Sequence, residues 1–143
     1  MNEQQTIQAI LEAGHIVAFV GLSPKPRRES FGVSRAMQAA GWRIIPVNPM
    51  AAERGETILD EKAYATLADA AQHESIDLVN VFRNAEDVPP VMDEAIAIGA
   101  PAVWLQMGIR HDAAAAQARA AGLKVVQDRC LKVEWMMRGR SSA

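Results

Sequence analysis

The chain contains a single cysteine, Cys130, among its 143 residues, so no disulfide can form within it. Aromatic residues make up only 5% of the chain, whereas hydrophobic residues make up 50%. A core built from Ala, Val, Ile and Leu is typical of a parallel sheet packed by helices. The chain has neither a charged and then apolar leader nor an apolar run of membrane-spanning length. We therefore expect a cytoplasmic protein with no membrane partner.

The chain also has no large excess of positive or negative residues, because its formal net charge is -2 and its pI is about 5.9. This slightly acidic balance argues against a nucleic-acid-binding surface. The three histidines, His15, His73 and His111, lie far apart without metal-ligand spacing, so we expect no metal site. The Gly-x-Ser-x-Gly nucleophile motif is absent as well. We predict no catalytic residue.

The length predicts one domain over residues 1–143, which is large enough for a core but too short for a second, catalytic domain. Five apolar segments, separated by helical patterns, are typical of strands: 16–20, 43–47, 77–82, 102–106 and 123–127. This alternation predicts an α/β fold, a Rossmann-like doubly wound five-stranded parallel sheet with helices on both faces and the strand order 3-2-1-4-5. Pro46 suits an edge strand better than a central one. We expect a loop over residues 50–62 and a frayed tail over 138–143.

The loop after the first predicted strand is the best candidate for a ligand site. Gly21 and Ser23 end the strand in a turn where the backbone can approach a ligand closely. We expect Ser30 to be the N-cap of the following helix, in which Val33 lies on the apolar face. A helix N-terminus presents free amides and the positive end of the helix dipole, which suits a phosphate.

The same loop is locally basic. Lys25, Arg27 and Arg28 bring three cations into four residues. Each guanidinium can hold a phosphate through two parallel hydrogen bonds, so the loop predicts a ligand with more negative charge than one pyrophosphate. The alternative is that these cations are simply solvated, as Lys and Arg on loops often are.

In the expected strand order the chain reverses direction between the first and fourth strands. Ligands of such sheets bind outside the carboxyl ends of the strands at this point. The expected lining, beside the loop at 21–30, is Asn48, Pro49, Phe82, Arg83, Gln106, Gly108, Asp128 and Cys130.

A nicotinamide or flavin dinucleotide is one candidate ligand, and two features argue against it. The Gly-x-Gly-x-x-Gly fingerprint is absent, because Ser23 replaces its second glycine and the basic insertion separates Gly21 from Gly32. The acidic residue that would bind the ribose hydroxyls after the second strand is also missing, since Asn48-Pro49 stands there. The absence of this carboxylate fits a ligand with a phosphorylated ribose, because a carboxylate would repel the phosphate.

Several segments, spread over nearly the whole chain, can be compared with known families: Gly21 to Pro26 with Arg28, Ser30 and Gly32-Val33; Ile45 to Pro49; Val81-Phe82-Arg83; Trp104 to Gly108; and Asp128-Arg129-Cys130 with Glu134. Together and in this order they resemble the stand-alone CoA-binding domain proteins, which are similar to the N-terminal CoA-binding domain of the succinyl-CoA synthetase α subunit. The resemblance implies CoA as ligand, with its phosphates at the first loop and its adenosine end near Asn48-Pro49 and Phe82-Arg83. It implies no reaction, because the synthetases carry their phosphorylated histidine in a following ligase domain.

We therefore expect a non-catalytic module that binds CoA or acyl-CoA, a sensor or carrier that reports to a partner. Its expected associations are with a protein partner or in a homo-oligomer. The alternative is an enzyme, either an NAD(P)-type oxidoreductase or a CoA-dependent transferase. Phe82 could stack on adenine or belong to the core, and Cys130 could be reactive or simply a small buried residue. The predicted ligand-binding residues are Gly21, Ser23, Lys25, Arg27, Arg28, Ser30, Gly32, Val33, Asn48, Pro49, Phe82, Arg83, Gln106, Gly108, Asp128 and Cys130.

Overall fold

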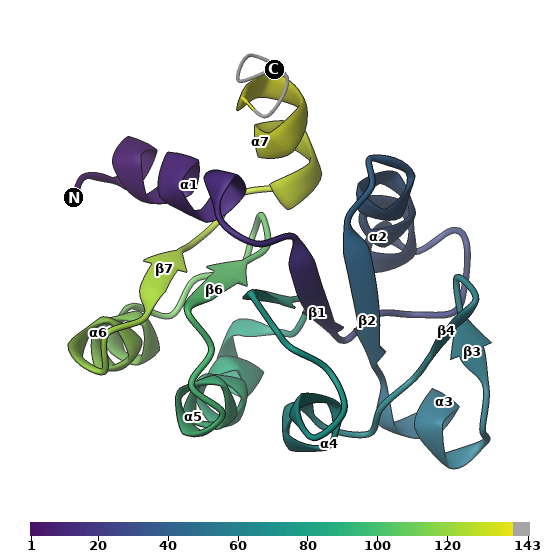
Figure 1. Ribbon diagram of the computed structural model, residues 1–143. Helices are drawn as coiled ribbons and strands as arrows, with labels where there is room; N and C mark the ends of the chain where they lie inside the picture. Colours follow the sequence, from purple (N-terminus) through teal and green to yellow (C-terminus); the bar gives the residue numbers. More distant parts are fainter. Residues whose placement is uncertain (139–143) are drawn as a thin grey trace.

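The computed structural model describes residues 1–138. Its centre is a parallel sheet of the strands β1 (Ile16–Val20), β2 (Arg43–Val47), β5 (Leu78–Val81), β6 (Ala102–Leu105) and β7 (Lys124–Val126). One face is covered by α1 (Glu3–Glu12), α2 (Glu29–Ala39) and α7 (Leu131–Arg138), and the other by α4 (Leu67–Ala71), α5 (Val88–Ala97) and α6 (Asp112–Ala120) (Figure 1). The predicted fold class, a Rossmann-like five-stranded parallel α/β sheet, is confirmed.

The central strands are apolar throughout because both of their faces are covered. In β1, Val17 and Phe19 belong to the core beneath α1, α2 and α7. The alternating residues Ala18 and Val20 belong to the core against α4, α5 and α6. Successive side chains of a strand point to opposite faces, so a strand between two helical layers needs an unbroken apolar run.

The strand order differs from the expected one in the position of the third strand. The observed order is β2-β1-β5-β6-β7, which is 2-1-3-4-5 when these five strands are counted along the chain, rather than 3-2-1-4-5. The outer edge of β2 is instead covered by a parallel bridge from Val47 to Tyr64, where the Tyr64 amide donates to the Pro46 carbonyl at 2.9 Å. The connection between the second and third strands thus occupies the expected place of the third strand. Pro46 lies on an edge strand, as its missing N–H favours.

Residues 50–62 contain more regular structure than the expected loop. They include most of α3 (Pro49–Glu53) and a short hairpin of β3 (Thr57–Ile58) and β4 (Glu61–Lys62). The hairpin turns at Leu59 and Asp60, both with left-handed φ values of 54° and 64°. Such turns usually carry an Asn-Gly or Asp-Gly pair, and the absence of that signal explains why the hairpin is hard to recognise.

The end of the described chain is anchored at Arg138, the last residue of α7, whose Nε donates to Glu134 Oε1 at 2.8 Å. Arg138 therefore does not belong to a frayed tail, and the remaining residues of that prediction, 139–143, lie outside the described residues. Within residues 1–138, no helix combines the length and apolar character needed to cross a bilayer.

The start of β1 yields a first prediction. Asp77 Oδ2 accepts a hydrogen bond from the Ile16 amide at 3.0 Å, and a Cβ on Gly14 would lie 2.2 Å from that oxygen. Gly14→Ala must displace the carboxylate, so we predict a loss of about 1–3 kcal/mol in the free energy of unfolding, measured by urea denaturation. The control is Gly32→Ala in α2, where an added Cβ meets no atom within 4 Å. Equal stability of the two variants would contradict the prediction.

Candidate functional site

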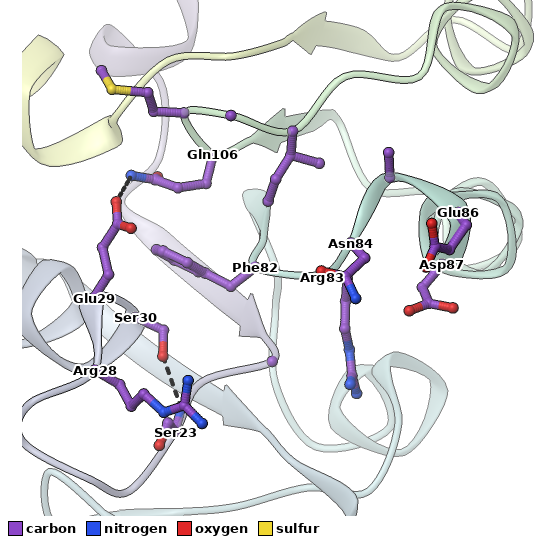
Figure 2. Close-up of a pocket in the computed structure, with 15 residues that line it drawn as sticks. Ser23, Arg28, Glu29, Ser30, Phe82, Arg83, Asn84, Glu86, Asp87 and Gln106 are labelled. Carbon is purple, nitrogen blue, oxygen red and sulfur yellow. Dashed lines mark hydrogen bonds between the residues drawn. The ribbon is translucent and has the colours of Figure 1, made fainter.

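A cavity of about 870 Å³ opens at the carboxyl ends of β1, β5 and β6 (Figure 2). In the observed order the chain reverses direction between β1 and β5, the point at which sheets of this kind bind ligands. Three segments line the cavity: Gly21, Ser23, Arg28, Glu29 and Ser30 after β1; residues 82–87 after β5; and residues 106–109 after β6.

Backbone hydrogen bonds bring these segments to one edge of the sheet. The Phe82 amide donates to the Val20 carbonyl at 2.8 Å, and the Gln106 amide donates to the Val81 carbonyl at 3.2 Å. Because parallel strands end at the same edge, the residues that follow them become neighbours although they are distant in the sequence. The predicted site residues Phe82, Arg83, Gln106 and Gly108 thus share a cavity with the loop after β1.

Gly21 is the point where two of these segments touch. Its φ of +88° lies in the left-handed region, and a Cβ there would lie 2.3 Å from the Phe82 carbonyl oxygen. Only glycine satisfies both the backbone conformation and the close approach. The predicted turn at Gly21 is confirmed, but the close approach here is to the Phe82 carbonyl, and the approach of a ligand to this turn stays a prediction.

The loop after Gly21 is closed by its own serines. The Ser23 amide donates to Ser30 Oγ at 3.0 Å, and the Lys25 amide donates to Ser23 Oγ at 3.1 Å. Ser30 is the second residue of α2 and not its N-cap, because Arg28 holds that position. The predicted capping role of Ser30 is therefore wrong: its oxygen is engaged by the loop, which it holds against the helix.

The N-terminus of α2 lacks a side-chain cap. Arg28, the N-cap residue, makes no capping hydrogen bond. The N-termini of α1, α3, α4 and α6, by contrast, are capped by the side chains of Asn2, Asn48, Thr66 and His111. The first amides of a helix have no acceptor within the helix, and the helix dipole adds positive potential there. The start of α2 is thus suited to an anion at the cavity.

The three loop cations do not share one environment. All three are exposed, but only Arg28 lines the cavity, and Lys25 and Arg27 lie outside its lining. A second lining cation, Arg83, comes from the segment after β5. Cationic recognition in this cavity would therefore involve one arginine from each of two segments.

Three carboxylates also line the cavity, and none of them is among the predicted ligand-binding residues: Glu29, Glu86 and Asp87. Glu86 and Asp87 lie in a 3-10 turn (Ala85–Asp87) that follows β5. Their position shortly after the carboxyl end of a central strand was the available signal. Asn84, Ala85 and Ile109 complete the lining that was not predicted, and Met107 lines the cavity between the predicted residues Gln106 and Gly108.

Gln106 lies at the base of the cavity. Its side-chain Nε2 donates to Glu29 Oε1 at 3.2 Å, as the dashed line in Figure 2 shows. The residue is only 1% exposed, and its Oε1 has no hydrogen-bond partner among the described residues. A buried amide oxygen without a hydrogen-bond donor lowers the stability of the fold, so a donor at this position would be stabilising.

Two predicted residues after β2 have structural contacts instead of lining this cavity. Asn48 Oδ1 accepts from the Ala51 amide at 3.0 Å and caps α3, while its Nδ2 donates to the Leu22 carbonyl at 2.9 Å. Pro49 is the first residue of α3 and lines a separate cavity of about 380 Å³. Asn48 therefore holds the loop after β1 in place from the side of β2 and is not part of the cavity lining.

The remaining predicted residues also lie outside the lining. Gly32 is inside α2, and Val33 is 3% exposed in the core. Asp128 Oδ1 accepts from the Gly108 amide at 2.6 Å, so it supports the segment after β6. Cys130 is 8% exposed and packs in the core, which favours the interpretation that it is a small buried residue.

The contact at Gly21 gives a second prediction. Gly21→Ala places Cβ against the Phe82 carbonyl, so we expect it to destabilise the protein by more than the roughly 1 kcal/mol of a left-handed alanine alone. Gly122→Ala is the matched control, because Gly122 has a φ of +93° but no atom within 4 Å of an added Cβ. The two unfolding free energies are compared by urea denaturation. A loss at residue 122 as large as that at residue 21 would contradict this account.

Comparison with known proteins identifies the family. Residues 15–136 match the family model described as CoA binding domain. The chain is 41% identical over 127 residues to the uncharacterized protein YneT of Bacillus subtilis (strain 168), covering 89% of this chain and 90% of that protein. The solved structure of cell-free ID.343 from Thermus thermophilus is 36% identical, with a TM-score of 0.87 over 96% of this chain and 99% of that one. A hypothetical protein from Pyrococcus horikoshii OT3 is 29% identical, with a TM-score of 0.85 over 96% and 92% of the two chains. This chain belongs to the CoA binding domain family.

Proposed function

We propose that the protein binds CoA or acyl-CoA in the cavity at the carboxyl ends of β1, β5 and β6, and serves as a binding or sensor module. The observation that carries the proposal is the uncapped N-terminus of α2 beside two lining arginines, Arg28 and Arg83. Helix amides and guanidinium groups are the donors that phosphate groups prefer in proteins. Membership of the CoA binding domain family supports CoA as the phosphate-bearing ligand.

The size and composition of the cavity agree with this ligand. Its volume of about 870 Å³ lies in the upper part of the range of roughly 300–1,000 Å³ for small-molecule sites. The lining joins charged groups with the ring of Phe82, which is half-buried and packs against Phe19 with ring centroids 6.2 Å apart. We propose that the adenine of CoA stacks on Phe82, near Arg83, because an aromatic ring fixed by a neighbour offers a rigid stacking surface.

The simplest test is ligand-dependent stability. CoA at about one hundred times its dissociation constant should raise the free energy of unfolding by roughly 2.7 kcal/mol. We predict a clear increase in the thermal unfolding midpoint with CoA and none with NAD(H) or NADP(H) at the same concentration. A midpoint that rises with a nicotinamide dinucleotide and not with CoA would overturn the proposal in favour of an oxidoreductase.

Two of the four cations near the site, Arg28 and Arg83, line the cavity, and the other two, Lys25 and Arg27, serve as controls. Replacing Arg28 or Arg83 by Ala should weaken CoA binding by about 1.5–3 kcal/mol, the range of a hydrogen bond to a charged group. Lys25→Ala and Arg27→Ala remove the same charge from exposed positions outside the lining, so their effect should be small and should vanish at high salt. Titration calorimetry measures the four affinities.

The stability of the four variants without ligand provides the internal check. Lys25, Arg27 and Arg28 are exposed, and exposed cations contribute within about 0.5 kcal/mol, so the unfolding free energies of these three variants should not change beyond that. Arg83 is partly buried, so its variant is compared by its affinity relative to its own stability. Equal losses of affinity in all four variants would show that only the overall positive charge around the cavity matters. A loss of stability in step with affinity would show a structural role.

A further inference from the structure

The segment after β6, residues 106–109, forms one wall of the cavity. Within it, the Ile109 amide donates to the Gln106 carbonyl at 2.9 Å and closes a turn. The Gly108 amide is not used by this turn, and donates to Asp128 Oδ1 at 2.6 Å. Asp128 lies between β7 and α7, in a connection that contributes no residue to the lining. The conformation of this wall therefore depends on a residue outside the cavity.

Asp128 holds the segment through two hydrogen bonds. Its carboxylate oxygen accepts from the Gly108 amide, and its own amide donates to the Ile109 carbonyl at 3.2 Å. A single bond would leave the segment free to rotate about it, whereas two bonds to adjacent residues fix both its position and its orientation. The preceding residue adds a third contact, because Gln127 Oε1 accepts from the His111 amide at 2.7 Å. The segment is thus attached along its length to the connection after β7.

The backbone of Asp128 has an unfavourable conformation. Its φ of 58° lies in the left-handed region, which aspartate adopts more readily than most residues but which only glycine adopts without strain. Glycine at this position would relieve the strain and would also remove the carboxylate that binds the Gly108 amide. A strained conformation that persists is a reason to look for a function of the residue. The contact of Asp128 with the cavity wall is the candidate for that function.

On the basis of the proposed function, we infer that Asp128 is a positioning residue for CoA binding. It holds residues 106–109 in the conformation that receives the ligand and does not contact the ligand itself, because its carboxylate is engaged by Gly108 and lies outside the lining. When the carboxylate is removed, the segment samples other conformations and only a fraction of the molecules is ready to bind. The apparent affinity then falls by that fraction.

Two substitutions separate the side-chain contact from the backbone conformation. Asp128→Gly removes the acceptor but relieves the left-handed strain, so its thermal unfolding midpoint without ligand should lie within about 4 °C of the natural one. Its affinity for CoA, measured by titration calorimetry, should nevertheless fall about three- to tenfold, as expected when the segment is competent for roughly 10–30% of the time. Asp128→Asn keeps an Oδ1 acceptor and tolerates a left-handed φ. It should bind CoA within about twofold of the natural affinity.

Asp60→Gly is the matched control. Asp60 has a φ of 64° in the turn between β3 and β4, outside the cavity lining, so this variant gives the same relief of strain without loosening the wall. Its affinity for CoA should equal that of the natural protein. A merely structural role of Asp128 would lower the unfolding midpoint of Asp128→Gly and leave its affinity unchanged, which would overturn the inference.

The Gly108 amide gives a readout that needs no ligand. Its hydrogen exchange, followed by NMR, should be at least about tenfold faster in Asp128→Gly than in the natural protein or in Asp128→Asn. Equal exchange in all three proteins, or an affinity of Asp128→Asn that falls as far as that of Asp128→Gly, would overturn this inference alone. Tighter CoA binding by Asp128→Asn than by the natural protein would show that the carboxylate repels the ligand directly, and would overturn it too. Absence of CoA binding by the natural protein would overturn the proposed function and this inference with it.

Discussion

The approach of residue 21 to the Phe82 carbonyl is the constraint on which the cavity depends. Two strands that are neighbours in the sheet end in segments that must diverge to leave room for a ligand, yet begin in close contact. The backbone meets both requirements because residue 21 has no side chain and a left-handed φ of +88°. The segment after β1 can therefore turn away at once towards α2, and the segment after β5 continues past it towards the 3-10 turn. The opening between them is the cavity.

The loop that follows is held by the protein itself. Ser30 Oγ and Ser23 Oγ each accept a backbone amide of the loop, and Asn48 donates to the Leu22 carbonyl from the side of β2. A loop whose conformation is fixed before binding loses little entropy when a ligand arrives. The residues after β2 thus contribute to the site indirectly, through the shape of the loop.

The bounds of individual strands could be predicted from the sequence more fully than the order of the strands in the sheet. The bounds of β1 and β2 follow from apolar runs buried on both faces, whereas the strand order depends on which edge the long connection to β5 covers, and no local pattern records this. Pro46 was the usable signal, because an edge position for β2 excludes a third strand outside it.

The missed carboxylate at Glu29 has a similar cause. With Ser30 as the cap, residue 29 would lie outside the helix. In the structure it is the first helical residue, and its side chain turns from Arg28 towards Gln106. A shift of two residues in the N-cap position thus decides which side chains face the cavity. The direction of a side chain depends on this helical register, which a sequence pattern defines only to within a residue or two.

The covered edge of β2 has a consequence for how the protein could meet other chains. The bridge to Tyr64 and the missing N–H of Pro46 leave β2 with little free backbone to pair, and the opposite edge strand, β7, is only three residues long. Short or covered edges hinder the strand-to-strand addition through which sheets join or aggregate. Helices and loops therefore offer more surface for contact with other chains than the sheet edges do, and the segments that line the cavity are themselves the loops at that end of the sheet.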